Sequence, residues 1–163
     1  MRWPSLDRSF VVIACSIVLL GAGAARADGI APPFVLRTLD GKTLRSTELK
    51  GRPVILDFWA MWCAPCRASM PHLNTMQVRY RDRGLVVVGL SVDDEDGQLV
   101  KRFAERLGVT FRVGLADDRL LDQYGPLRAI PTTIFINRRG DVVRRVVGYI
   151  DGETLETYVL ELF

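Results

Sequence analysis

The segment Trp62-Cys63-Ala64-Pro65-Cys66 constrains this chain more than any other part of it. Residues 54–60, which end one residue before this segment, have the apolar pattern of a buried strand, and a helix is expected from Pro65 onward. Cys63 then lies at a strand-to-helix junction, where the helix dipole and free backbone N–H groups favour a thiolate over a thiol. This arrangement predicts thiol–disulfide exchange, with Cys63 as the nucleophile and Cys66 as the resolving thiol.

A structural disulfide is the alternative use of such a pair. A bridge this local removes little chain entropy from the unfolded state, because the stabilisation grows with the length of the closed loop. A free thiol with a pKa near 8.5 is only about 3% thiolate at pH 7. The pKa values of CxxC thiols at helix N-termini are lower, roughly 3.5–7.5. The sequence therefore favours a catalytic pair.

The first 27 residues have the composition of a secretory signal peptide. Arg2 and Arg8 flank the start of an apolar run at about 10–25, and Ala-Arg-Ala at 25–27 has the form of a cleavage site. The run of roughly 16 residues is shorter than the about 20 that cross a bilayer. We therefore expect cleavage after Ala27 and a periplasmic protein.

Two alternatives exist for this segment: an uncleaved membrane anchor, and a lipid on Cys15, whose preceding residues resemble a lipobox. Only about five apolar residues precede Cys15, and the apolar run continues past it, so both come second to cleavage.

The mature chain, residues 28–163, is long enough for one core and too short for two. Its charge is nearly balanced, since removal of the first 27 residues reduces the 22 basic and 19 acidic residues to 19 and 18. We therefore expect one domain and no nucleic-acid partner.

Asp57 is the one charged residue of the predicted strand 54–60. A carboxylate in a buried strand is costly unless its pKa rises or it finds a partner. A raised pKa would let Asp57 take the proton of Cys66 in the resolving step. The alternative is that Asp57 faces a polar cavity or only accepts a hydrogen bond.

The rest of the chain alternates strands and helices and ends in a hairpin followed by a helix, which predicts an α/β sandwich with a mixed sheet. Further strands are expected at 34–36, 85–92, 111–116, 132–137 and 142–148, and helices at 65–83, 96–107, 120–124 and from 151 onward. Four acidic residues at 93–96 are expected to form the solvated N-terminal turn of a helix rather than a metal site.

Phe58-Trp59-Ala60-Met61-Trp62-Cys63-Ala64-Pro65-Cys66-Arg67, with Ile130-Pro131-Thr132-Thr133, resembles the motifs of the thioredoxin superfamily. Within it, residues 30–163 resemble the exported TlpA/ResA-like, AhpC/TSA-related thiol-disulfide oxidoreductases. The resemblance implies a three-layer α/β/α sandwich, with the extra helix and strand of that branch at about 96–116. It also implies that Pro131 is a cis-proline facing the cysteines. Substrate contacts are then expected from Trp62, Ala64, Pro65, Ile130 and Thr132.

Two positions differ from many members of this branch: Ser69 stands where reductases of apocytochrome c often carry glutamate, and Asp57 where many have asparagine. We expect a monomeric reductase without a cofactor, acting on a disulfide-bearing client. That client is apocytochrome c or a copper-site assembly protein, and a membrane electron donor re-reduces the enzyme because its compartment is oxidising.

Two other functions of the same fold remain as alternatives, a copper-binding chaperone and a thiol peroxidase. Copper carriers of similar fold need a distant histidine as third ligand, and the chain has none after its single histidine, His72. Zinc needs four ligands and fails the same requirement. Peroxidases of related architecture need a hydroxyl residue three positions before the reactive cysteine, where this chain has Ala60. We therefore expect no metal ligands.

Overall fold

The computed structural model describes residues 29–94, 96–125 and 127–163. The predicted signal peptide of residues 1–27, its cleavage site after Ala27, and Cys15 lie outside these residues.

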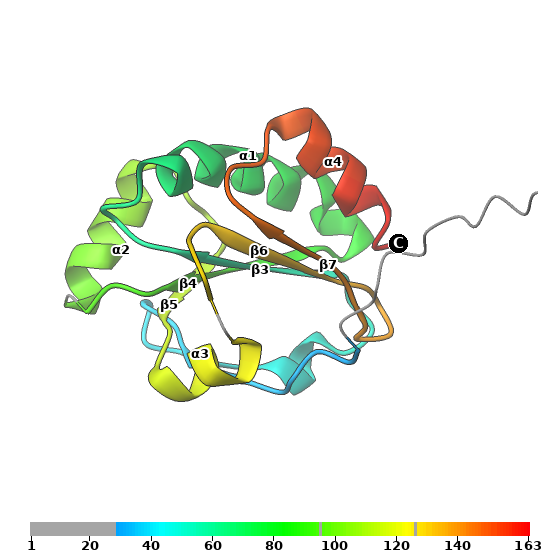
Figure 1. The fold of residues 1–163 in the computed structure, drawn as a ribbon, viewed down its shortest axis with the longest axis horizontal. Coiled ribbons are helices and arrows are strands. Elements are labelled where there is room, and N and C mark those ends of the chain that lie inside the picture. The colour runs from blue at the N-terminus through cyan, green and yellow to red at the C-terminus, as the bar shows by residue number, and fades with distance from the viewer. Residues whose placement is uncertain (1–28, 95, 126) are drawn as a thin grey trace, which may run out of the picture.

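A five-stranded mixed sheet in the order β5-β4-β3-β6-β7 forms the middle layer of the domain (Figure 1). Its strands are β3 (Val54–Trp59), β4 (Val86–Ser91), β5 (Arg112–Leu115), β6 (Thr132–Ile136) and β7 (Val142–Val147). β3, β4 and β5 are parallel, β6 is antiparallel to β3, and β7 is antiparallel to β6. Every residue of β3 and β4 is buried. These strands are covered on both faces, which explains why their sequences are continuous rather than alternating apolar runs.

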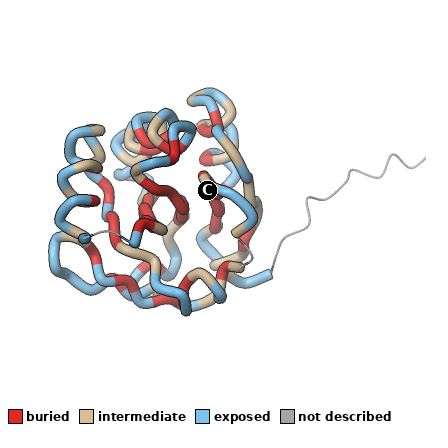
Figure 2. Tube along the Cα trace, turned by 60° about the vertical axis from the view of Figure 1, so that its left-hand side comes forward, coloured by how far each residue is buried: buried red, intermediate tan, exposed pale blue. Residues whose placement is uncertain are grey.

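Helices α1 (Ala64–Tyr80), α2 (Gly97–Arg106) and α4 (Gly152–Leu160) cover one face of the sheet (Figure 1). The other face is covered by α3 (Asp118–Tyr124), the hairpin of β1 (Val35–Arg37) and β2 (Thr43–Arg45), and the 3₁₀ turn η1 (Ser46–Leu49). A second 3₁₀ turn, η2 (Arg81–Arg83), follows α1. Each face has its own apolar cluster, and Figure 2 shows the buried segments running through the interior between exposed outer turns.

The predicted three-layer sandwich and mixed sheet are confirmed, and α2 and β5 are the additional helix and strand expected at 96–116. The strand β2 was not predicted. It has three residues, only the middle one buried, and it pairs with β1 in a two-stranded sheet apart from the main one. So short an element has too few alternating positions to stand out in a sequence.

Candidate active site

The cysteine pair lies at the junction between β3 and α1. Cys63 is the N-cap of α1 and Cys66 lies in its first turn, with Pro65 at a position whose missing N–H costs the helix nothing. The two residues form a disulfide with Cα atoms 5.2 Å apart. The Sγ atom of Cys63 accepts a hydrogen bond from the backbone N–H of Cys66 at 3.2 Å. The helix therefore directs the positive end of its dipole and a backbone N–H donor at the Cys63 sulfur, as the sequence predicts.

The two sulfur-bearing residues are almost closed to solvent, with Cys63 4% exposed and Cys66 0% exposed. Their neighbour Trp62 is 70% exposed, and Ala64 and Pro65 are exposed as well. An open indole beside a barely accessible disulfide gives an approaching polypeptide an apolar surface to contact before it reaches sulfur.

The Ile130–Pro131 peptide bond is cis, as the resemblance implies. Thr132 pairs with Phe58 in the antiparallel register of β6 and β3. Continuing that register places Pro131 beside Trp59, the last residue of β3, at the same end of the sheet as the cysteines.

The loop before Pro131 joins Trp62 in forming a hollow of about 610 Å³, lined by Trp62, Val92, Leu121, Asp122, Gly125, Leu127, Ala129 and Ile130. Two predicted contact residues, Trp62 and Ile130, therefore lie around one cavity. The Thr132 side chain is 1% exposed and its hydroxyl donates to the Ala129 carbonyl at 2.7 Å. It holds the loop together rather than presenting its side chain to solvent.

Asp57 is fully buried in the middle of β3. Asp57 lies two positions from both Ile55 and Trp59, so its side chain points to the same face of β3 as theirs. Ile55 and Trp59 belong to the apolar cluster that contains Cys66, and the Asp57 side chain therefore faces the layer beneath α1. One carboxylate oxygen accepts a hydrogen bond from the Thr133 hydroxyl at 2.8 Å, and the other has no partner among the described residues. Burial raises the pKa of Asp57 to about 7, against the opposing effect of the Thr133 hydrogen bond.

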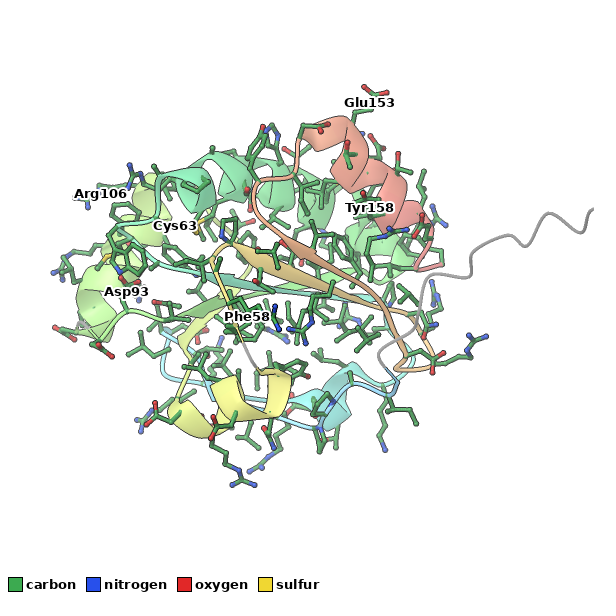
Figure 3. The ribbon with its side chains drawn as sticks, viewed as in Figure 1. Phe58, Cys63, Asp93, Arg106, Glu153 and Tyr158 are labelled. Carbon is green, nitrogen blue, oxygen red and sulfur yellow. A yellow bond between two sulfur atoms is a disulfide. The ribbon has the colours of Figure 1, made fainter. Side chains whose placement is uncertain are left out.

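Asp93 shows the prediction for the acidic run at 93–96 to be wrong at its first residue. Asp96, not Asp93, is the N-cap of α2, and Asp93 is only 8% exposed. Both carboxylate oxygens of Asp93 accept from the backbone N–H of Met61, at 3.2 and 3.1 Å, and one accepts from the Ser91 hydroxyl at 2.7 Å. Figure 3 shows Asp93 and Cys63 at the same end of the molecule.

This contact fixes the turn that leads into the cysteine pair. Asp93 holds the N–H of Met61, and the Arg67 guanidinium donates to the Met61 carbonyl at 2.9 Å. One signal in the sequence could have revealed Asp93: it follows the buried strand β4 at the spacing that continues the inward side of Ser91.

Other polar residues near α1 do not join the site. His72 pairs with the Tyr149 hydroxyl at 3.2 Å. Ser69 is buried and its hydroxyl donates to the Pro65 carbonyl within the same helix, at 3.1 Å. Within residues 29–94, 96–125 and 127–163, no three or more histidine, cysteine, aspartate or glutamate side chains gather where they could hold a metal ion. The helices in these ranges are also too short or too polar to cross a membrane.

Comparison with known proteins decides the family, because the AhpC/TSA family model matches residues 28–145. The chain belongs to the AhpC/TSA family. This AhpC/TSA protein is 34% identical to the thiol-disulfide oxidoreductase ResA of Bacillus thuringiensis (strain Al Hakam) over 133 residues, which cover 81% of this chain and 76% of the relative. It is also 34% identical to ResA of Geobacillus thermodenitrificans over 137 residues, 83% of this chain and 78% of the relative.

A solved structure agrees. The thiol:disulfide interchange protein, thioredoxin family protein, from Chlorobium tepidum TLS superposes with a TM-score of 0.77 at 31% identity, covering 85% of this chain and 97% of that one. The AhpC/TSA protein is thus a thiol-disulfide oxidoreductase of the thioredoxin superfamily, similar to ResA, as its motifs predict.

Proposed function

We propose that the protein is a periplasmic reductase that cleaves disulfides in partner proteins, with Cys63 attacking and Cys66 resolving. One observation carries the assignment of roles: the N-terminus of α1 points its backbone N–H donor at the Sγ atom of Cys63, not of Cys66. The same donor stabilises negative charge on that sulfur once the disulfide is reduced. Cys66, 0% exposed within the helix, is reached only after a client has joined Cys63.

The reaction takes two exchanges. The Cys63 thiolate attacks one sulfur of the client disulfide, which forms a mixed disulfide and releases the other client sulfur as a thiolate. Cys66 then loses its proton and attacks Cys63, which forms the Cys63–Cys66 disulfide and releases the second client thiolate. Two electrons pass from the enzyme to the client, and a dithiol donor at the membrane returns them.

Asp57 is the proposed acceptor of the Cys66 proton. Its side chain faces the same layer as Cys66, and its second carboxylate oxygen has no partner among the described residues. A carboxyl group with a pKa of about 7 is half ionised near neutral pH, so it can take a proton in the resolving step and return it later. An ordinary aspartate would be too weak a base for this role.

The proposed clients are apocytochrome c or a copper-site assembly protein, bound through exposed Trp62 and the hollow that it shares with Ile130. Position 69 of α1 is a serine whose hydroxyl donates to a carbonyl of its own helix. The proposed proton acceptor, Asp57, therefore comes from β3 rather than from α1. The periplasmic location rests on the signal-like composition of residues 1–27.

Trapping of the mixed disulfide tests the assignment. Cys66→Ser removes the resolving thiol, so we expect the variant to accumulate a covalent adduct with disulfide-bearing peptides, through Cys63 and sensitive to reductant. Peptides copied from the cysteine-bearing segments of apocytochrome c and of a copper-assembly protein separate the two client classes. Cys63→Ser is the matched control and should trap nothing. An adduct on Cys63→Ser, through Cys66, would reverse the assignment of nucleophile and resolving thiol.

A further inference from the structure

The end of the sheet opposite the cysteines has its own character. β3 and β4 begin there and β6 ends there, because β6 runs against them. The six residues of β3 separate this end from the active-site turn by roughly 20 Å. Figure 1 shows the turn between β6 and β7 and the start of the described chain at this end, and the connection from β3 to α1 at the other.

A hollow of about 490 Å³ opens at this end between the first described residues, η1 and the β6–β7 turn. Its apolar lining includes Ile30, Pro32, Pro33, Phe34, Leu49 and Ile136. Four basic residues also line it, Lys50, Arg52, Arg138 and Arg139, and no aspartate or glutamate among the described residues does so. We call this site the basic hollow.

The positive charge of the basic hollow is poorly neutralised. Lys50 is exposed and has no ion pair with any described residue. Arg52 and Arg138 donate to backbone carbonyls, those of Gly84 at 3.0 Å and Arg83 at 2.7 Å, and so keep their full charge. Among the described residues, only Arg139 of these four has a carboxylate partner, Asp141 at 2.9 Å, and its side chain is still 82% exposed. An anionic ligand would thus meet at least three uncompensated cations.

The opposite end of the domain carries charges of both signs, because Lys101 and the exposed Arg119 lie among its acidic residues. Exposed aspartates follow β4 and β5 there, at positions 94, 96, 117 and 118. A negatively charged surface would therefore be attracted to the basic hollow, where no acidic residue among the described ones lines the cavity, more than to the mixed charges of the active-site end.

We propose that the basic hollow binds the headgroup of an anionic phospholipid and seats this end of the domain on a membrane, with Cys63 facing away. Its apolar lining and the 78% exposed side chain of Ile30 match a ligand that joins a phosphate to hydrocarbon. Ile30, which lines the hollow, follows the apolar run at about 10–25 in the sequence. The hollow therefore offers a phospholipid both positive charge and apolar surface. The inference is independent of the direction of electron transfer.

Hydrogen–deuterium exchange of the full chain in nanodiscs tests the proposal, because it reads contact with lipid separately from insertion of the apolar run. We expect residues 29–33, 49–52 and 136–140 to exchange more slowly on discs of phosphatidylcholine with phosphatidylglycerol than on discs of phosphatidylcholine alone. Equal exchange on the two kinds of disc overturns the proposal. So does equal slowing by inorganic phosphate on neutral discs, which would make the hollow a site for free anions.

The double variant Lys50→Gln/Arg139→Gln removes two exposed charges of the basic hollow. Each basic residue near an anionic membrane is worth about fivefold in affinity, so we expect roughly 30-fold weaker contact and loss of the slowed exchange. Arg102→Gln/Arg106→Gln on α2 removes the same amount of charge from exposed positions elsewhere. This control variant should keep the slowed exchange on anionic discs. An equal loss of slowed exchange in both variants would show that lipid contact depends on net charge alone, and would overturn the proposed binding site. Unchanged disulfide reduction by either variant confirms that it is folded.

Discussion

On the face of the sheet covered by α3, the buried residues of the central strands are hydrocarbon, such as Leu56, Phe58 and Ile134, except for Thr132 at the start of β6. On the face covered by α1, the alternate residues of the same strands include Asp57, Ser91 and Thr133, beside the cysteine pair. Because successive side chains of a strand point to opposite faces, one short sequence builds both environments. Both faces pack an apolar cluster, and the α1 face also carries buried polar groups that cost stability and, in the proposed mechanism, supply the proton acceptor.

The sharpest test of this division is removal of the nucleophile. We expect Cys63→Ser to lose disulfide reduction by more than about 10³-fold, since the hydroxyl cannot form the mixed disulfide. We also expect it to stay folded, because the lost bridge closes only a four-residue loop. Insulin reduction and thermal unfolding measure the two quantities. A variant that fails to fold would show that the pair is structural.

The α3 face should respond in the opposite way. Phe58 is fully buried and its ring centroid lies 6.0 Å from that of Tyr124. We expect Phe58→Ala to lower the free energy of unfolding by about 3–5 kcal/mol, through lost burial and the cavity left behind. The folded fraction should keep its rate of disulfide reduction. Chemical denaturation with activity measured per folded molecule separates these effects, and a lost rate without lost stability would refute the division.

Asp57→Asn tests the stability cost of the α1 face. The pKa of Asp57 is about 7 in the folded protein and near its ordinary 3.8 when unfolded, so the folded state binds more protons between these values. The free energy of unfolding therefore falls as pH rises from about 4 to about 7 and levels off above. Asp57→Asn should remove this decline and be more stable at pH 8, by on the order of 3 kcal/mol. Urea unfolding across pH measures it.

The same variant should slow the resolving step on the order of 10²-fold while leaving the attack of Cys63 unchanged, because only the second exchange uses the Asp57 carboxylate. Rapid-quench separation of the two exchanges measures this. An unaltered resolving rate would leave Asp57 with no part in proton transfer.

Asp93→Asn is the matched substitution elsewhere on the site and should have the smallest effect. The amide oxygen can still accept from Met61, but without the charge, so we expect a loss of about 1 kcal/mol in stability and a few-fold in rate. Asp93 is a positioning residue in this account. The decline of stability with pH expected for the parent protein should therefore persist in Asp93→Asn. If the decline disappeared in this variant, it would come from Asp93 rather than from Asp57.

The sequence was informative where chemistry depends on local spacing. The cysteine pair, the helix that Cys63 caps and the charged residue inside β3 all follow from neighbouring positions. For Asp93, the spacing after β4 indicates only an inward-facing side chain. Its partner Met61 lies 32 positions away, and only the parallel pairing of β3 and β4 brings the two residues together. An acidic residue before a helix has the same local pattern whether it caps the helix or holds a distant turn.

The reduction potential of the Cys63–Cys66 pair, measured by equilibration in thiol redox buffers, tests the central claim most directly. A reductase predicts a value near −250 mV or below, close to the about −270 mV of thioredoxin. A value near −120 mV, that of a strong periplasmic oxidant, would mean that the protein makes disulfides rather than breaking them.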